Sequence, residues 1–181
     1  MTAMTKYIRY IRYILTHKYY CALALISLGH YWQALTHDIS KFSPAEFFAY
    51  ADWFSDESFL AIKFNCERLK GQVDNPEYKR RKHAYDAAVL HHYHNNPHHW
   101  QYWCYVNRWC FSDVDTTASV IAIEMPDKYV IEMVCDWLAA GKALNSQQSA
   151  LDWFNHNESS MLFHTATKAK VRQLLEKICN G

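Results

Sequence analysis

The chain has 181 residues, of which 50% are hydrophobic and 16% aromatic, and its formal net charge is +1. This composition excludes an intrinsically disordered chain, and the balanced charge gives no argument for nucleic acid or for a cationic partner. The length is sufficient for one domain with a substantial core, so we expect a single domain over residues 1–181.

Apolar residues recur with helical spacing along most of the chain, and this pattern predicts an all-α fold. The first helix is expected over residues 5–28, and Gly29 is suited to its C-terminal cap. The most apolar run, Cys21 to Gly29, is shorter than the ~20 residues that a bilayer requires, so we expect no membrane contact. A short second helix is expected to begin near Tyr31.

The segment Ser43-Pro44-Ala45-Glu46 is the strongest start signal for a helix. Ser43 suits the N-cap and Pro44 the first helical position, while Glu46 can close a capping box with Ser43. We expect this helix to run, with or without a break, to about Lys70.

The next helix is expected to begin at Pro76 and to end before Pro97, because the residue before a proline disfavours the α region. A further helix is expected to open at His98 and to carry Trp100, Trp103 and Asn107 on one side.

The rest of the chain is also predicted to be mainly helical. Residues 120–123 are expected to form a short extended piece, and helices are expected over residues 126–140, 150–155 and 165–179.

Histidines are concentrated at one point of the chain. Five of the 11 histidines fall within the nine residues His91-His92-Tyr93-His94-Asn95-Asn96-Pro97-His98-His99. On helical spacing, His92 lies on the apolar, core-facing stripe, and His91 and His94 flank it. Neutral imidazole is the commonest metal-ligand side chain, so the cluster indicates a metal centre.

A second signal is the dipeptide His37-Asp38. Neighbours on a helix point about 100° apart, so both side chains reach one metal only near a helix end. Further ligands must come from other helices, and His17 and Asp136 each lie within an apolar helical context. A polar group buried among such neighbours needs a partner, because its burial otherwise costs a few kcal/mol.

On this pattern the chain resembles the HD-domain superfamily of metal-dependent phosphohydrolases. The run His37-Asp38-Ile39-Ser40-Lys41 is similar to that superfamily's His-Asp-Ile-Gly-Lys run, with Ser40 in place of Gly. The resemblance implies an HD-like helix bundle whose metal ligands are His17, His37, Asp38 and Asp136. His17 precedes His37 by a short spacing for the first ligand, and His30 is an alternative.

A narrower resemblance is to an uncharacterised family of small phage and bacterial proteins. It is carried by residues 37–47, 94–103 and 124–137, and covers about residues 15–145. It implies no particular activity; if the protein is phage-encoded, it would act in the host cytoplasm.

The additional histidines resemble the binuclear branch of the HD superfamily. This implies two divalent ions, drawn from Mn, Fe, Co, Ni or Zn, with Asp38 shared between them. The second ion needs about two histidine ligands, and the candidates for these two positions are His92, His94, His98 and His99.

Two charged residues are candidates for direct roles in the reaction. Lys41 follows Asp38 by three residues, so its ammonium suits a phosphate oxygen, although a solvated lysine gives the same pattern. Glu132 precedes Asp136 by one helical turn. It is a candidate general base, metal ligand or hydrogen-bond acceptor for a buried histidine.

Together these features predict a metal-dependent phosphohydrolase acting on a nucleotide or another small phosphoester. The alternatives are an HD-type di-iron oxygenase, or a non-enzymatic binding protein with a structural metal or a polar histidine core. Six scattered cysteines without a CxxC pair, and no visible secretory signal, lead us to expect a cytoplasmic protein; the oligomeric state is left open.

Overall fold

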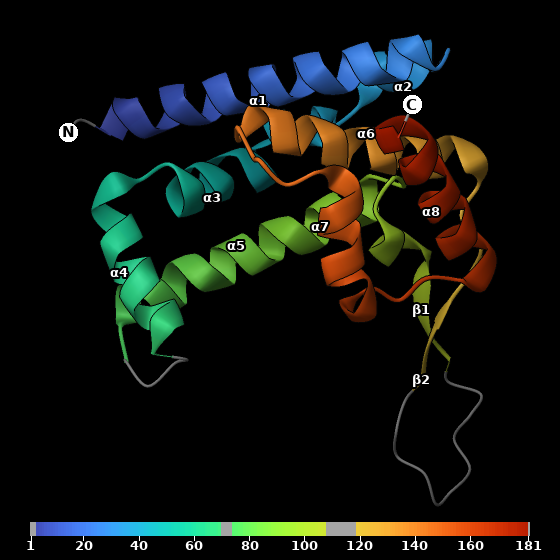
Figure 1. Ribbon diagram of the computed structural model, residues 1–181. Helices are drawn as coiled ribbons and strands as arrows, with labels where there is room; N and C mark the ends of the chain where they lie inside the picture. The colour runs from blue at the N-terminus through green and yellow to red at the C-terminus, as the bar shows by residue number, and fades with distance from the viewer. Residues whose placement is uncertain (1–2, 70–73, 108–118, 181) are drawn as a thin grey trace, which may run out of the picture. The chain divides into compact units, whose positions relative to one another are not determined.

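The computed structural model describes residues 3–69, 74–107 and 119–180. Over these residues the fold is mostly helical, with one two-stranded antiparallel sheet, which confirms the predicted all-α class (Figure 1). The chain divides into two compact units. Unit 1 comprises the chain up to Thr16 together with Asp38–Asn95, and unit 2 comprises His17–His37 and the chain from Asn96 onward. The prediction of a single domain stays a prediction.

The helix α1 (Ala3–Ser27) contributes residues to both units and ends close to its predicted limit. Gly29 follows it with a φ of 80°, a left-handed conformation that is easy for glycine, as expected of a C-terminal cap. None of the helices in the described part of the chain is long and apolar enough to cross a membrane.

Unit 1 is built on two helices that pack against each other, α3 (Pro44–Phe54) and the longer α5 (Pro76–Asn95). Its buried core contains Tyr10, Ile14, Tyr50, Ala51 and Ala88. The elements of the unit, besides the first part of α1, are the 3₁₀ turn η1 (Ile39–Phe42), α3 (Pro44–Phe54), α4 (Glu57–Arg68) and α5 (Pro76–Asn95).

The start of α3 corrects one prediction. Pro44 occupies the first helical position as expected, but the Ser43 side chain makes no capping hydrogen bond. Glu46 is fully buried and its carboxylate is bound by histidines of α5. The predicted capping box is therefore wrong, because the imidazoles of the half-buried His91 and the buried His92 bind the carboxylate that a local backbone N–H would otherwise bind.

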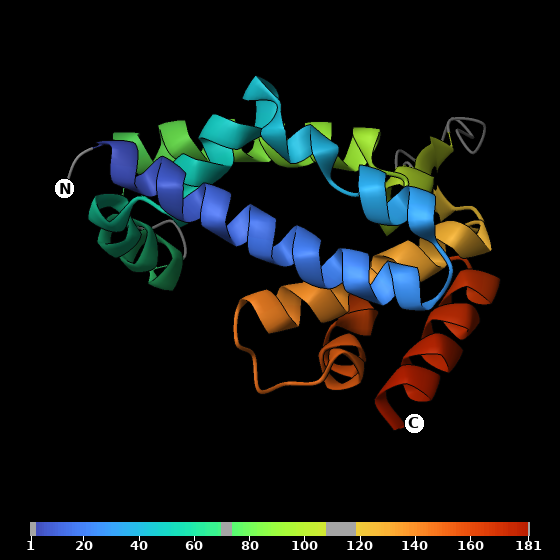
Figure 2. The same ribbon diagram turned by 90° about the horizontal axis from the view of Figure 1, so that it is seen from above.

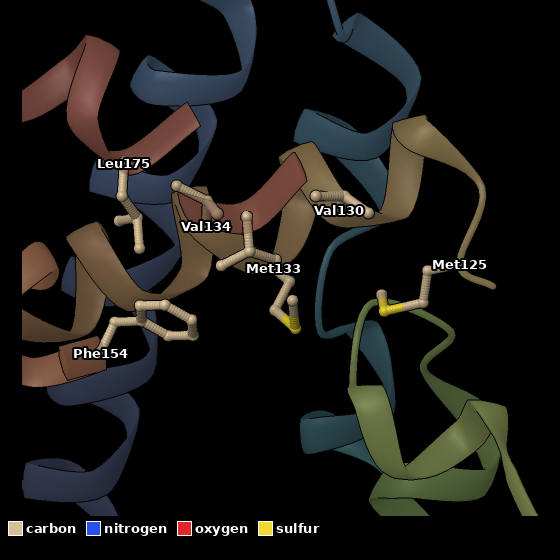
Figure 3. Packing of buried hydrophobic residues seen from close by; sticks show 7 residues of the cluster. Met125, Val130, Met133, Val134, Phe154 and Leu175 are labelled. Atoms are coloured by element: carbon tan, nitrogen blue, oxygen red, sulfur yellow. The ribbon is translucent and has the colours of Figure 1, made fainter. Parts of the chain in front are cut away.

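In unit 2 the helices α6 (Asp127–Ala143), α7 (Ala150–Asn157) and α8 (Thr165–Asn180) pack around an apolar cluster. Val134, Phe154 and Leu175 lie close together in it (Figure 3). The remaining members of this cluster are Met125, Val130, Met133 and Val171. The elements of the unit, besides the end of α1, are α2 (Tyr31–Thr36), η2 (Trp100–Trp103), β1 (Cys104–Asn107), β2 (Ser119–Ala122), α6 (Asp127–Ala143), α7 (Ala150–Asn157), η4 (Glu158–Ser160) and α8 (Thr165–Asn180).

The helix predicted to open at His98 is wrong. One 3₁₀ turn is followed by the strand β1, which pairs antiparallel with β2, with Cys104 opposite Ala122. Tyr105 and Val106 favour strands, and cross-strand pairing outweighs the helical spacing of the aromatic residues before them. The predicted extended piece at 120–123 is confirmed as β2.

Asp56 joins three elements of unit 1. It caps α4 by accepting the Ser58 N–H at 3.1 Å, and its carboxylate lies 2.8 Å from Arg81 Nη1 and 3.7 Å from Lys6 Nζ. Burial alone would raise the pKa of Asp56, but hydrogen bonds from Ser58 and Arg81 and the nearby positive charges lower it to about 2.

We predict that Asp56→Asn lowers the free energy of unfolding by about 1 kcal/mol at neutral pH, because asparagine keeps the cap but loses the ion pairs. The folded-state pKa lies below the unfolded value of about 3.9. The wild-type advantage is therefore complete above that value and disappears as the pH falls towards 2. Urea denaturation of both proteins over this pH range measures it; a deficit independent of pH would contradict the assignment.

Candidate metal centre

Five polar side chains are buried together in unit 2, and we name them the Glu132 cluster: His17, His37, His98, Glu132 and Asp136. α1 supplies His17, and His37 follows the last residue of α2. His98 lies just before η2, and the two carboxylates lie one turn apart on α6. The structure thus brings His17, His37 and Asp136 together, as the sequence predicts for these three.

One side of the cluster is a compact set of three donor atoms. His17 Nε2 lies 2.9 Å from Asp136 Oδ1 and 3.3 Å from His37 Nε2. His37 Nε2 lies 3.4 Å from the same Asp136 oxygen. All three atoms belong to a group of potential metal ligands that lie within 4.8 Å of one another.

The other side of the cluster is centred on Glu132. Its Oε1 atom lies 3.1 Å from His37 Nδ1 and 3.2 Å from His98 Nδ1. Burial alone would raise the pKa of Glu132, but the hydrogen bonds from His37 and His98 lower it below its ordinary value. Glu132 is therefore ionised in the interior and accepts N–H groups from both rings.

This arrangement selects the tautomer of His37. Glu132 is an ionised acceptor, so His37 Nδ1 carries a proton and donates it to the carboxylate. A neutral His37 ring then has its lone pair on Nε2, which faces His17 and Asp136. A carboxylate that orients a ligating histidine in this way is the usual support of a protein metal site.

The backbone at His37 is also held in place. Lys18 Nζ donates to the carbonyl oxygen of His37, and the His37 N–H donates to Gln33 O at 2.8 Å. The next residue, Asp38, has a φ of 54°, a left-handed conformation that is uncommon outside glycine and concentrated at functional sites.

Unit 1 contains a second group of polar side chains, which we name the Glu46 cluster: Asp38, Lys41, Glu46, His91 and His92. Glu46 Oε1 lies 2.8 Å from His91 Nδ1, and Glu46 Oε2 lies 2.8 Å from His92 Nδ1. Burial alone would raise the pKa of Glu46, but the interactions with His92, followed by those with His91 and Ser40, lower it.

Within the Glu46 cluster, Asp38 lies between a cation and an imidazole. Its Oδ2 atom is 2.5 Å from Lys41 Nζ and its Oδ1 atom 3.4 Å from His92 Nε2. Lys41, which the sequence predicts to act on substrate phosphate, is therefore an ion-pair partner of Asp38 in this structure.

Several residues that the sequence predicts as metal ligands lie outside the Glu132 and Glu46 clusters. His94 is exposed near the end of α5, and among the described residues no group of potential metal ligands includes it or His30. His99 is half-buried, with its ring centroid 4.3 Å from that of His98. The ligand roles predicted for His92, His94, His98 and His99 stay predictions.

Sequence reasoning missed Glu46. The only signal available was a glutamate directly before the strongly apolar stretch of α3, and the capping-box pattern offered a local explanation for it. Its actual partners lie 45 and 46 residues further along the chain.

The donor set of the Glu132 cluster fits a first-row divalent metal, because imidazole nitrogen and carboxylate oxygen are ligands that such ions accept. With neutral rings, Glu132 and Asp136 together carry two negative charges in the interior, which one divalent ion offsets. With protonated rings, the same residues form an ion-pair network that needs no metal.

Residues 6–179 match a protein family described as a family of unknown function, DUF5662. The chain belongs to the DUF5662 family. All residues of the Glu132 and Glu46 clusters fall within the matched range of this DUF5662 protein. No curated protein and no solved structure matches the chain. The resemblance to the HD-domain superfamily stays a prediction.

Substitutions of Glu46 and Ser43 should differ strongly in their effect on the free energy of unfolding. We expect Glu46→Gln to lower the free energy of unfolding by about 2–3 kcal/mol, because the amide NH₂ would face one of the two imidazole N–H groups that now donate to the carboxylate. Ser43→Ala should change it by less than about 0.5 kcal/mol, because the hydroxyl caps nothing. Urea denaturation measures both, with Glu67→Gln at an exposed site of α4 as the control. A larger loss in the Ser43 variant would restore the capping box.

Proposed function

We propose that this DUF5662 protein is a metal-dependent phosphohydrolase that acts on a nucleotide or another small phosphoester. The observation that carries the proposal is the orientation of His37 by Glu132, which turns Nε2 towards His17 Nε2 and Asp136 Oδ1. The hydrolytic chemistry is supported by the resemblance of the His37–Lys41 run to the HD superfamily.

In this proposal His17, His37 and Asp136 hold a divalent ion of the Mn, Fe, Co, Ni or Zn group. These three ligands, and also four if Asp38 is added, leave positions for water and substrate on an ion that accepts six ligands, as in catalytic rather than structural sites. When bound, such an ion supplies Lewis acidity towards a phosphoryl oxygen and towards water. Glu132 keeps His37 in the ligating tautomer, so we assign it a positioning role rather than that of a general base.

The roles proposed for Asp38 and Lys41 rest on the HD resemblance. Asp38 would be a further carboxylate ligand. The Lys41 ammonium has donors only, so it cannot ligate metal while protonated, and it would stabilise the charge that develops on a phosphoryl oxygen.

The number of ions follows from what Glu132 does. His37, His98 and Glu132 form a second group of potential ligands within unit 2. If Glu132 acts as a hydrogen-bond acceptor, one ion binds in unit 2; if it ligates together with His98, a second ion binds there. Metal titration of Glu132→Gln separates the two cases, because loss of a ligand removes one ion whereas loss of an acceptor weakens the binding of the remaining one.

A second candidate is a polar core without metal, and it is favoured by the 2.9–3.4 Å distances, which are also those of hydrogen bonds and ion pairs. A di-iron oxygenase is the remaining alternative. It requires iron and O₂, whereas a hydrolase works under anaerobic conditions with Mn²⁺ or Co²⁺.

We predict that the purified protein contains a divalent metal and that His37→Ala abolishes its binding, because His37 belongs to both ligand groups of unit 2. Chelator should lower the melting temperature of the wild type, since metal binds the native state only. His156→Ala, at an exposed site of α7, is the control and should retain metal. Elemental analysis and thermal denaturation provide the measurements. If the wild type is free of metal and its melting temperature changes with neither chelator nor added metal, the polar core without metal is favoured.

We further predict that Lys41→Gln reduces phosphoester turnover by roughly 10²–10³, the usual loss when one charge-stabilising donor is removed. Glutamine keeps a hydrogen-bond donor for Asp38, so metal content should be retained, and Lys41→Arg should keep more of the rate. Initial rates on nucleotides and generic phosphoesters, with metal analysis of each variant, test this. Full turnover by Lys41→Gln would remove Lys41 from the reaction.

A further inference from the structure

Unit 2 has an exposed apolar surface, in contrast to its buried polar Glu132 cluster. Seven large apolar side chains within 17 consecutive residues are exposed, and Trp32, at 72%, is the most exposed of them. We name them the 19–35 patch: Tyr19, Leu23, Ile26, Leu28, Tyr31, Trp32 and Leu35. They come from the end of α1 and from α2, which folds back beside it (Figures 1 and 2).

The patch is not required by the core of unit 2. The opposite faces of the same two helices supply Cys21, Leu25 and Ala34, which pack with Cys135 and Ala139 of α6. α2 has no buried residue, although half of its six positions are Tyr31, Trp32 and Leu35. Single exposed apolar residues are normal on a protein surface, but a contiguous group of this size marks an interaction site.

The charge of the patch limits what can cover it. From Tyr19 to Thr36 the sequence contains no Asp, Glu, Lys or Arg. The basic residues of α1, which are Lys6, Arg9, Arg12 and Lys18, all precede the patch, so the patch itself offers no positive charge to an anionic membrane surface. A charged protein partner would likewise find no opposite charge. Two uncharged copies of the patch can meet without repulsion, and Tyr and Trp are the usual anchors of protein interfaces.

The area of the patch is close to what a dimer needs. A large aliphatic side chain removes roughly 60–120 Å² of apolar surface when it is buried. Three of the seven side chains are aromatic, and a whole aromatic side chain covers roughly 150–250 Å². Weighted by their exposures of 39–72%, the seven side chains together provide roughly 400–700 Å². Polar neighbours at the rim would bring this towards the ~800 Å² per partner of a standard interface. A partner that covers the patch with a single side chain or loop would leave most of it in water.

We propose that the 19–35 patch is the contact surface of a homodimer, in which two copies of the chain pack patch against patch about a two-fold axis. Such an interface is self-complementary, because each copy offers the same residues to the other. Trp32 and Leu35 are its expected anchors, since they are among the most exposed side chains of the patch. The proposal is independent of the metal and of the phosphohydrolase activity.

Sedimentation equilibrium of the purified protein tests the dimer. We expect the wild type to have twice the mass of one chain at about 10–100 µM, and Trp32→Glu with Leu35→Glu to raise the dimer dissociation constant roughly 30-fold or more. Both side chains are exposed, so circular dichroism and melting of the diluted variant should match those of monomeric wild type. Leu90→Glu, an exposed leucine of α5 outside the patch, is the matched control and should remain dimeric.

Three outcomes would overturn the proposal. The wild type could be monomeric up to about 100 µM, a concentration at which an interface of this size should associate. The double variant could dimerise as tightly as the wild type, which would place the interface elsewhere. A monomeric wild type that co-sediments with phosphatidylcholine–phosphatidylglycerol vesicles through Trp32 would make the patch a lipid-binding surface.

Discussion

The burial of Glu132 is the constraint on which unit 2 depends. An ionised carboxylate inside a protein is costly unless charged or strongly polar groups face it, and here both facing groups are imidazole N–H donors, from His37 and His98. Meeting that requirement draws together segments that are far apart in the chain: the end of α2, the turn before η2 and the middle of α6. The same hydrogen bond fixes which nitrogen of His37 is left to bind a metal. Stability and the proposed chemistry therefore have one origin.

Unit 1 solves the same physical problem with different residues. Glu46 is also a buried glutamate bound by Nδ1 of two histidines, in this case the adjacent His91 and His92 of α5. In both units the Nδ1 atoms are occupied by a carboxylate, so the opposite side of each ring remains for other partners. In each unit one buried glutamate therefore holds two histidines. The exposed His94, by contrast, has no place in the groups of potential ligands found among the described residues.

α2 lies between two features of unit 2, the 19–35 patch and the buried Glu132 cluster. It is six residues long, has no buried residue, and is followed directly by His37. Its inward contact is made by Ala34, while Trp32 and Leu35 face solvent. So short a helix gains little stability from its own hydrogen bonds. Contact of a second chain on its outer face would stabilise a helix that unit 2 itself contacts through Ala34.

The sequence by itself determined most of the helices, because apolar periodicity, proline and glycine act within a few residues. The helices predicted over residues 5–28 and 126–140 are found as α1 (Ala3–Ser27) and α6 (Asp127–Ala143). It also singled out His17, His37 and Asp136, since polar residues in apolar surroundings demand partners. Only the tertiary structure decided which residues those partners are. Glu132 lies 95 residues from His37 in the sequence, and Glu46 lies more than 40 residues from the histidines that bind it. The pairing of β1 with β2 was equally hidden, because a strand is stabilised by its neighbour rather than by its own spacing. A sequence pattern reports interactions between residues a few positions apart, so it predicts helices. Which distant residues become partners depends on which buried charges need a hydrogen-bond or ion-pair partner in the folded chain.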